Sequence, residues 1–256
     1  MSLRRLIVSW QCETTRAFLP VAELIEVNET DGDRFEFGYL EGVRGAMERG
    51  FQPFLAFPDL DRRYASATLF PFFQNRVLPT TRPDYLDYVA ALGLSPEAVN
   101  VVELLGRSEG RRQTDRIETV LAAQREPTTG GYVTRFLARG VRHLDGAEAA
   151  ILGLEAGAIL TPMLDSANPV NPRARLLRVG EQSVGFVPDY LLADMEVLDR
   201  GEAGPTFTVE RINPAPHPTH HRLLVRLDAP WPEGFEPFQA APFQRYRPEK
   251  DERLAG

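Results

Sequence analysis

The sequence of 256 residues predicts an α+β protein of two domains, and three observations lead to this prediction. Stretches in which apolar and polar residues alternate, as in half-buried strands, recur along the chain. Shorter stretches with apolar residues at helical spacing lie between them. A turn-rich stretch at 124–132, with a proline followed by two glycines, has the composition of a linker. A chain of this length fits one large or two ordinary domains, and the linker favours two, at 1–126 and 127–256.

Strands come first in the N-terminal domain. Residues 6–10 and 24–27 have the apolar pattern of strands, and in 35–39 aromatic residues alternate with a glutamate and a glycine. A short helix is expected at 39–49, where apolar residues recur at helical spacing and a glycine follows. These elements predict an antiparallel sheet accompanied by helices.

The segment 51–79 is rich in both phenylalanine and proline. Prolines at this density interrupt regular structure, whereas the aromatic side chains require burial. We therefore expect an irregular but well-packed segment with a short helix at 69–76. Two further helices are expected at 83–92 and 96–105, and a strand at 117–121.

Three motifs organise the second domain. They are Gly140-Val141-Arg142-His143, then Asn168-Pro169-Val170-Asn171-Pro172, and then Val184-Gly185-Phe186-Val187-Pro188. The second motif cannot be helical, because each proline lacks a backbone N–H and pushes the preceding residue to extended geometry. From 140 to 188 the pattern predicts strand, helix, strand, proline-rich turn, strand, turn, strand and helix.

After these motifs the chain continues with strands and ends in an aromatic tail. Strands are expected at 207–212 and 222–227, joined by a proline-rich loop at 213–219. The aromatic residues of 231–246 are expected to pack in the core or between domains, with a groove for a partner as the alternative. The charged end of the chain, 248–256, is expected to be disordered.

The order and spacing of the three motifs resemble the HIRAN domain, a small β-rich module of certain repair helicases. That family shows a Gly-apolar-Arg-aromatic start, an Asn-Pro-x-Asp turn and a Gly-x-apolar-Pro element, which here are 140–143, 168–171 and 185–188. Two positions depart from the pattern, because His143 stands for the family's aromatic residue and Asn171 for its aspartate. The resemblance implies that the second domain is a small β-barrel of the OB type.

The HIRAN resemblance also implies a ligand. Family members whose ligand is known bind single-stranded DNA ends, including the free 3′ hydroxyl. By this resemblance Arg142 and His143 would contact phosphate and base, and Asn171 would lie near the strand terminus. An amide is a weaker acceptor than a carboxylate, so the contact of Asn171 with the terminus is expected to be weaker than in the family.

Each candidate residue also has a purely structural interpretation. Arg142 and His143 fit an ordinary strand with an exposed arginine. Asn168, the other candidate acceptor, fits a turn that its side chain stabilises by bonding the backbone. Gly185 is a candidate because its backbone can approach a ligand closely, but a glycine in a strand also serves close packing.

A second basic group lies at 106–115, which is expected to be a loop. Arg107, Arg111 and Arg112 could reach phosphates from there. Arginines with acidic neighbours, such as Glu109 here, are also typical of a solvated turn.

The first half resembles the N-terminal subdomain of the HipA toxin kinases. The shared features are a Phe-x-Phe-x-Tyr strand at 35–39, the apolar 69–73 leading to 76–79, and a helix ending in Leu-Gly-Leu at 92–94. No glycine-rich phosphate loop or catalytic Asp/Asn pair of a kinase follows, and Lys250 is the only lysine. Since no nucleophile–base motif occurs elsewhere, the sequence predicts a protein that is not an enzyme.

Composition restricts which kinds of site and which cellular location the protein can have. Cys12 is the only cysteine, which excludes an intrachain disulfide and a cysteine-built zinc site. His217, His220 and His221 lack a neighbouring cysteine or carboxylate in the sequence, so no metal and no cofactor is expected. No apolar run approaches the roughly 20 residues that span a bilayer, and we expect a cytoplasmic protein without a membrane partner.

Two functions remain open at this point. The motifs favour a nucleic-acid-binding protein that recognises single-stranded DNA or DNA ends, in repair or in defence against foreign DNA. The formal charge of −7 favours the alternative, a protein-interaction or regulatory module such as a toxin–antitoxin-like inhibitor or adaptor. A positive surface around Arg142 would separate them, because an acidic surface cannot hold phosphate.

Overall fold

A computed structural model of the protein describes residues 2–29, 32–201 and 203–248. It has the predicted mixture of helices and antiparallel sheets. The chain divides into two compact units, each assembled from separate segments. Within the described residues, unit 1 contains 2–29, 32–76, 109–121 and 239–248, and unit 2 contains 77–108, 122–201 and 203–238. Both units mix segments from the two predicted ranges, and the assignment of 1–126 and 127–256 as domains stays a prediction.

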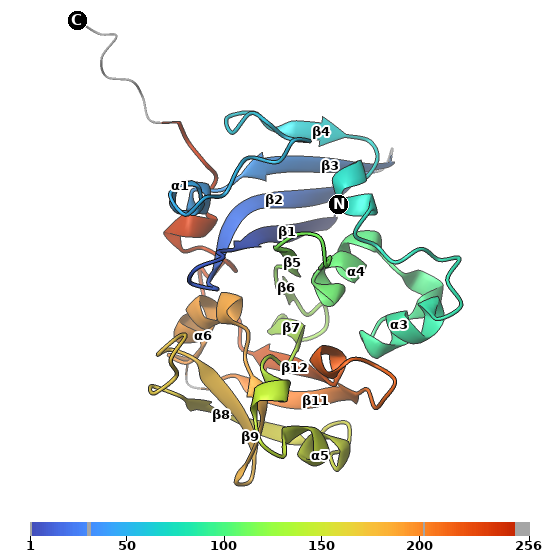
Figure 1. Cartoon of the computed structure of the whole chain (residues 1–256), viewed down its shortest axis with the longest axis vertical. Helices are drawn as coiled ribbons and strands as arrows, with labels where there is room; N and C mark the ends of the chain where they lie inside the picture. The colour runs from blue at the N-terminus through green and yellow to red at the C-terminus, as the bar shows by residue number, and fades with distance from the viewer. Residues whose placement is uncertain (1, 30–31, 202, 249–256) are drawn as a thin grey trace, which may run out of the picture. The chain divides into compact units, whose positions relative to one another are not determined.

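Unit 1 has a five-stranded antiparallel sheet within its described residues. Its strands are β1 (Ser2–Gln11), β2 (Phe18–Glu29), β3 (Gly32–Tyr39), β4 (Tyr64–Ser66) and β5 (Ile117–Leu121). Their order in the sheet is β4-β3-β2-β1-β5 (Figure 1). Four of these strands confirm the sequence prediction. The fifth, β4, was not predicted, because three residues are too few to show an alternation.

Aromatic side chains pack on β3. The ring of Phe37 stacks on Phe57 with 3.7 Å between the ring centroids. The hydroxyl of Tyr39 donates to the carbonyl of Phe57 at 2.7 Å and accepts from the N–H of Phe54 at 2.8 Å. Burial raises the pKa of Tyr39. These contacts confirm that 51–79 is irregular but well packed; its helix, α2 (Pro71–Gln74), lies inside the predicted range.

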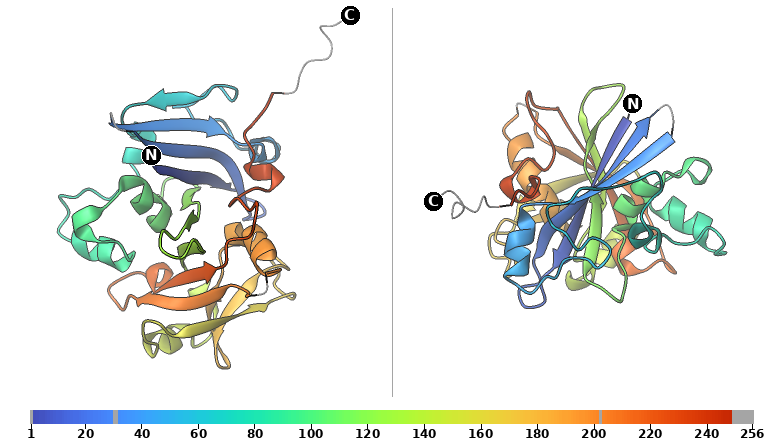
Figure 2. Two further views of the ribbon diagram at one scale, coloured as in Figure 1. Left: turned by 180° about the vertical axis from the view of Figure 1, so that it is seen from behind. Right: turned by 90° about the horizontal axis from the view of Figure 1, so that it is seen from above.

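The C-terminal segment of unit 1 packs against helix α1 (Gly42–Met47), which lies inside the predicted helix. The N–H of Tyr246 donates to the carbonyl of Tyr39 at 3.0 Å, and Arg5 donates to the carbonyl of Phe243 at 2.6 Å. The 3-10 helix η5 (Ala241–Phe243) and α1 lie side by side in Figures 1 and 2. From 239 onward the described tail therefore belongs to unit 1.

Unit 2 has a seven-stranded antiparallel sheet within its described residues. Its strands are β6 (Gln124–Arg125), β7 (Tyr132–Leu137), β8 (Ile159–Leu164), β9 (Arg175–Val179), β10 (Gln182–Phe186), β11 (Thr206–Ile212) and β12 (Leu223–Ala229). Their order is β10-β9-β8-β11-β12-β7-β6. The stretch 124–132 is a hairpin and not the expected linker, because β6 pairs with β7 across its turn.

The sheet of unit 2 is open. No ladder between its two edge strands closes it in the part of the chain that the structure describes. One isolated antiparallel bridge joins Arg139, just after β7, to Phe186 at the end of β10. The expected closed barrel is therefore not found; the observed structure is an antiparallel sheet with a single bridge across it.

Unit 2 also contains short helices. They are α3 (Tyr85–Ala91), η1 (Pro96–Ala98), α4 (Val101–Ser108), η2 (Val141–His143), α5 (Ala147–Leu152), η3 (Asp189–Leu191), α6 (Leu192–Leu198) and η4 (Thr219–His221). The predicted helix at 83–92 contains α3, and the one at 96–105 divides into η1 and α4. The prediction of a loop at 106–115 is wrong at its start, because α4 continues through Ser108. None of the helices in the described ranges is long and apolar enough to cross a membrane.

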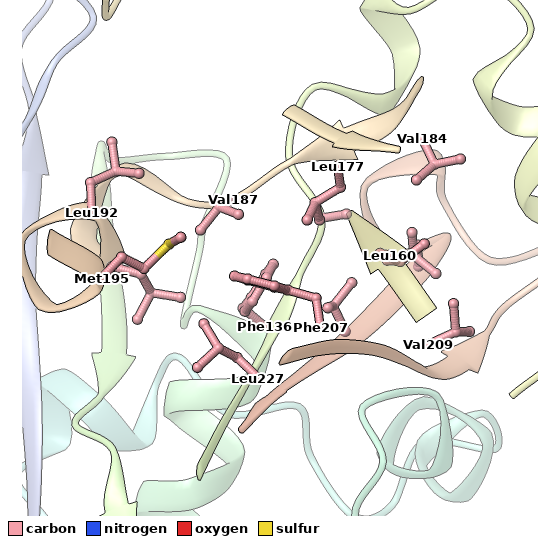
Figure 3. Packing of buried hydrophobic residues seen from close by; sticks show 14 of the residues in the cluster. Phe136, Leu160, Leu177, Val184, Val187, Leu192, Met195, Phe207, Val209 and Leu227 are labelled. Carbon is pink, nitrogen blue, oxygen red and sulfur yellow. The ribbon is translucent and has the colours of Figure 1, made fainter. Parts of the chain in front are cut away.

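The core of unit 2 is apolar (Figure 3). Phe136 of β7 and Phe207 of β11 meet edge-on with 6.3 Å between ring centroids. From the aromatic tail, Phe235 packs on Tyr132 at 6.0 Å, which confirms the predicted core packing. Burial raises the pKa of Tyr132. The disorder predicted for 248–256 falls, apart from residue 248, outside the described residues.

We expect Gly42→Ala to lower the free energy of unfolding by about 2–4 kcal/mol. A Cβ there would lie 2.2 Å from the carbonyl oxygen of Pro20 and 3.1 Å from that of Pro242. Gly45→Ala, in the same helix, is the control: its Cβ would meet only the end of Arg49 at 3.3 Å, and it should stabilise by about 0.5–1 kcal/mol. Urea unfolding measures both, and equal stabilities would contradict the close packing around α1.

Candidate functional site

The first and third motifs meet at the end of β10. Arg139 and Phe186 exchange two backbone hydrogen bonds of 2.9 and 2.8 Å in the bridge described above. At Gly140 the backbone is left-handed, with φ +68°, which turns the chain out of β7. A Cβ at Gly140 would lie 2.9 Å from the ring of Phe186, so this glycine lets the ring pack directly on the backbone.

Gly185 allows the same approach from the other chain segment. The pairing of β10 with β9 shifts register between Ser183 and Gly185, where the φ of Gly185 is +153°. A Cβ at Gly185 would lie 2.8 Å from the Cβ of Ala138 and 3.2 Å from the carbonyl oxygen of Arg139. Gly185 therefore lets its backbone lie close to another segment of the same chain. This agrees with the interpretation that the glycine serves close packing.

The second motif forms a turn that its own side chains stabilise. The Oδ1 of Asn168 accepts from the N–H groups of Val170 and Asn171 at 3.0 and 3.1 Å. Its Nδ2 donates to Asp165 at 3.1 Å. Asn168 thus uses both ends of its amide within the turn, as the structural interpretation predicts.

Asn171 links the second motif to the third. Its Oδ1 accepts from the N–H of Arg173 at 3.0 Å, and its Nδ2 donates to the carboxylate of Asp189 at 3.0 Å. Asp189 is exposed and directly follows Pro188 of the third motif. The structure therefore places a carboxylate beside the asparagine that stands where the HIRAN pattern has an aspartate. Sequence reasoning missed Asp189, although its position next to the third motif was a usable signal.

Arg142 and His143 lie on the 3-10 helix η2 and not on a strand, because the left-handed turn at Gly140 ends the extended geometry. Both side chains are exposed, and the Nε of Arg142 donates to the Nε2 of His143 at 3.0 Å. Among the described residues Arg142 makes no ion pair.

The arginines of the neighbouring strand β9 and its approach are all paired with carboxylates. They are Arg173 with Glu196 at 2.9 Å, Arg175 with Asp199 at 3.2 Å and Arg178 with Glu181 at 2.9 Å. Exposed pairs of this kind add little stability, but they cancel charge locally. The contrast identifies Arg142 as the guanidinium in this region whose charge is available to an anion.

An apolar row crosses the sheet next to η2. Register places Met163 of β8 opposite Leu176 of β9, and Leu176 opposite Phe186 of β10, so the three side chains share one face. Met163 is 42% exposed, and the other two are half-buried. Because Phe186 packs on Gly140, the row reaches the turn that carries Arg142. Sequence reasoning missed this row, since it depends on the pairing of three strands.

The second predicted basic group is not brought to this site. Arg107 lies in α4 of unit 2, where its side chain is 9% exposed, donates to the carbonyl of Leu92 at 3.2 Å and pairs with Glu103. Burial, reinforced by the charge of Arg135, lowers the pKa of Arg107 to about 10. Its side chain is thus committed to packing within unit 2.

Arg111 and Arg112 belong to unit 1. Arg111 pairs with Glu118 at 2.6 Å and Glu109 at 3.1 Å, and Arg112 is exposed. The three arginines of 106–115 therefore form no common surface within one unit, and their role in binding stays a prediction. No group of three or more histidine, cysteine, aspartate or glutamate side chains in the described ranges could hold a metal ion.

Comparison with known proteins adds little. No model of a known protein family matches the sequence, and no curated protein does. A crystal structure of a protein from Lactobacillus plantarum is 14% identical, with a TM-score of 0.31 over 42% of this chain and 93% of that chain. The HIRAN domain of human HLTF is 15% identical, with a TM-score of 0.29 over 38% of this chain and 74% of that chain. Similarities this low transfer no function, and the HipA resemblance of the first half stays a prediction.

We expect Gly185→Ala to lower the free energy of unfolding by about 3–5 kcal/mol, because it combines a steric overlap with Ala138 and an unfavourable φ. Gly180→Asn, in the turn between β9 and β10, is the control. Gly180 has φ +54° and no neighbour within 4 Å of its Cβ position, and asparagine tolerates this conformation, so the cost should be about 1 kcal/mol or less. Equal urea midpoints for the two variants would contradict the packing of Gly185.

Proposed function

We propose that the protein is a non-enzymatic nucleic-acid-binding protein that holds a single DNA strand at the three converged motifs of unit 2. The observation that supports this most directly is the exposed Arg142, which makes no ion pair among the described residues and lies at the end of a partly exposed apolar row. Sites for single strands combine cationic groups for the backbone with a platform on which bases stack.

Unit 2 has a form that suits this role. Its sheet is bridged at Arg139 and Phe186, and we interpret it as a HIRAN-like barrel of the OB type that is joined at one point. OB folds bind single strands on the exposed face of their central strands. In unit 2 the corresponding apolar face is that of β8, β9 and β10, at one end of the sheet, and it carries Met163, Leu176 and Phe186.

Arg142 and His143 would bind the backbone of the strand. The planar guanidinium of Arg142 can donate two parallel hydrogen bonds to one phosphate. His143 adds another donor next to the guanidinium, because the ring nitrogen that does not face Arg142 can donate a hydrogen bond. The nearby ring of Phe186 offers an aromatic surface for the base that follows.

The pair of Asn171 and Asp189 would bind the terminus of the strand. A carboxylate accepts a hydrogen bond from a hydroxyl strongly, whereas it repels a phosphate. Asn171 orients the carboxylate through the 3.0 Å bond from its amide. Such a site selects a free hydroxyl over a chain that continues through a phosphodiester.

A protein-interaction module is the second candidate, and the exposed apolar residues of unit 2 favour it. Met163, Leu164 and Val170 are 42%, 50% and 70% exposed. A protein partner could cover these side chains as readily as nucleobases could. The net charge of −7 also favours a partner other than nucleic acid.

A fluorescence anisotropy titration tests the proposal. Short single-stranded oligonucleotides with free and blocked 3′ ends are compared with duplex at two salt concentrations. We expect the single strand with a free end to bind best, and its affinity to fall as salt rises, because phosphate contacts release counterions. Folded protein that binds no strand at low salt would overturn the proposal and favour the protein partner.

Arg142→Ala should weaken binding of a single strand by about 1–3 kcal/mol, because it removes a charge-assisted contact with phosphate. Arg82→Ala is the matched control, since it removes an exposed guanidinium that is paired with Asp84 in unit 2. In Arg142→Ala, the slope of log affinity against log salt concentration should also decrease by the amount expected for about one phosphate contact. In Arg82→Ala this slope should stay the same. Unchanged affinity in Arg142→Ala would remove Arg142 from the site.

Asp189→Asn should abolish the preference for a free 3′ end while the affinity for a strand with a blocked end stays the same or rises. The reason is that the variant loses the strong acceptor and also loses a negative charge near the backbone. Asp84→Asn serves as the control for a lost surface carboxylate. If Asp189→Asn still prefers the free end, the terminus is bound elsewhere.

A further inference from the structure

Unit 1 has an open pocket of its own. Its volume is about 540 Å³, which is in the range of sites that hold small molecules. Three parts of the chain line it: the end of β1 with Trp10, the segment after α1 with Phe51, Gln52 and Phe54, and residues 113–117, which lead into β5. All of these residues belong to unit 1, and none of them takes part in the site proposed above.

Aromatic side chains form one wall of the pocket. Trp10 lies directly opposite Ile117 in the pairing of β1 with β5, so these two side chains share one face of the sheet. The ring of Phe51 packs on Trp10 with 5.7 Å between the centroids and on Phe54 at 5.2 Å. Phe51 is buried, whereas Trp10 is half-exposed. The indole of Trp10 is therefore supported by a buried ring and remains partly accessible.

A buried ion pair holds the loop before β5 in place. The Nη2 of Arg76 donates to the Oδ2 of Asp115 at 2.6 Å, and its Nη1 donates to Oδ1 at 3.1 Å. The same Nη1 donates to the carbonyl of Gly110 at 3.1 Å, and the Oδ1 of Asp115 accepts from the N–H of Ile117 at 3.0 Å. Because both ends of this loop are held, the pocket needs little rearrangement to accept a ligand.

The charged side chains that line the pocket are compensated. The carboxylate of Asp115 is paired with Arg76, as described above. The Nη2 of Arg116 donates to the carboxylate of Glu13 at 2.7 Å. Pairs of this kind cancel charge locally, so the lining favours an uncharged ligand group over an ion.

The neutral polar groups of the lining, in contrast, have capacity for a ligand. Gln52, Gln113 and Thr114 are exposed, and their side chains make no hydrogen bond within the ranges that the structure describes. The indole N–H of Trp10 has no acceptor in the same ranges. The pocket thus combines an aromatic surface with amide, hydroxyl and indole groups that can donate or accept.

We propose that this pocket binds a nucleobase, which stacks on the indole of Trp10 and bonds through its edge to the amides of Gln52 and Gln113. A side-chain amide has a donor and an acceptor side by side, which match the adjacent acceptor and donor on the edge of a base. Stacking on an aromatic side chain, together with hydrogen bonds to the base edge, is how proteins hold unpaired bases. This inference goes beyond the proposed function, because it concerns unit 1 and does not require unit 2 to bind a strand.

A base can reach the pocket as part of a free nucleotide or as part of a single strand. Both present the same planar ring and the same hydrogen-bonding edge. Since the charged side chains of the lining are compensated, the pocket is expected to recognise the base and to gain little from the phosphate. The ligand is therefore defined by its base, and the experiment distinguishes the two sources.

The two tryptophans of the chain provide a probe and an internal control. The indole N–H of Trp231, in unit 2, donates to the carbonyl of Phe235 at 3.0 Å. The NMR signal of the Trp10 indole N–H is assigned by its loss in Trp10→Phe. This signal should shift when adenosine monophosphate is added, and the signal of Trp231 should not. Ribose phosphate, which lacks a base, should shift neither, and an equal shift of Trp10 with ribose phosphate would overturn the proposal.

Variants of the two glutamines test the hydrogen bonds. Gln52→Ala and Gln113→Ala should each weaken the binding of adenosine monophosphate by about three- to tenfold, because each loses a hydrogen bond to the base edge. Gln239→Ala is the matched control, since Gln239 is an exposed glutamine of unit 1 outside the pocket. Affinity equal to that of the wild type in both pocket variants would refute the assigned site.

A strand of deoxyadenosines and an abasic strand of the same length identify the source of the base. A response of Trp10 to the first strand and not to the abasic one, without a response to the free nucleotide, would assign the base to a strand. No response to the strand or to the nucleotide, up to about 10 mM, would overturn the proposal.

The same titrations separate this inference from the proposed function of unit 2. A response of Trp10 to adenosine monophosphate in a protein that binds no strand would support the pocket and refute the proposed function. Strand binding that Arg142→Ala weakens, without a response of Trp10 to any base, would keep the proposed function and refute the pocket.

Discussion

The backbone bridge between Arg139 and Phe186 is the contact on which the candidate site depends. It brings two segments more than forty residues apart in sequence within hydrogen-bond distance, at 2.8 and 2.9 Å. Gly140 and Gly185 permit this approach, because a Cβ at either position would overlap the opposite segment. Glycine at both positions costs conformational entropy on folding, and the buried packing of Val141 and Val184 offsets it. Without the bridge, the turn that carries Arg142 would not adjoin the apolar row that ends in Phe186.

Charge distribution explains how an acidic chain can still have a site for an anion. Arginines at 173, 175 and 178 are each paired with a carboxylate, and Arg222 is bound to Glu148. At the ionic strength of a cell, fields from distant exposed charges are screened within about 8 Å, so the immediate neighbours of a site matter more than the net charge. Arg142 donates to His143 and makes no ion pair among the described residues. The formal charge of −7 therefore describes the protein as a whole and not the immediate neighbours of Arg142.

Local sequence patterns predicted elements well and side-chain roles less well. The turn role of Asn168 was predictable, because all its partners lie within three residues of it. The helical position of Arg107 was missed, since a glycine and two further arginines nearby resemble a loop. Asp189 was missed for a different reason: it acquires its meaning only from Asn171, eighteen residues earlier in the chain.

The sequence by itself determined the α+β class, most of the strands, and the three motifs around which unit 2 is organised. These features depend on periodicity, proline and glycine, which act over a few residues. Tertiary structure alone decided that the stretch at 124–132 pairs as a hairpin, that the tail from 239 joins unit 1, and that Met163, Leu176 and Phe186 share one face. Those outcomes depend on which strands pair and in which register, and a shift of one residue would turn every side chain to the other face. Local patterns contain no information about that choice, because it is made by contacts between segments far apart in the chain.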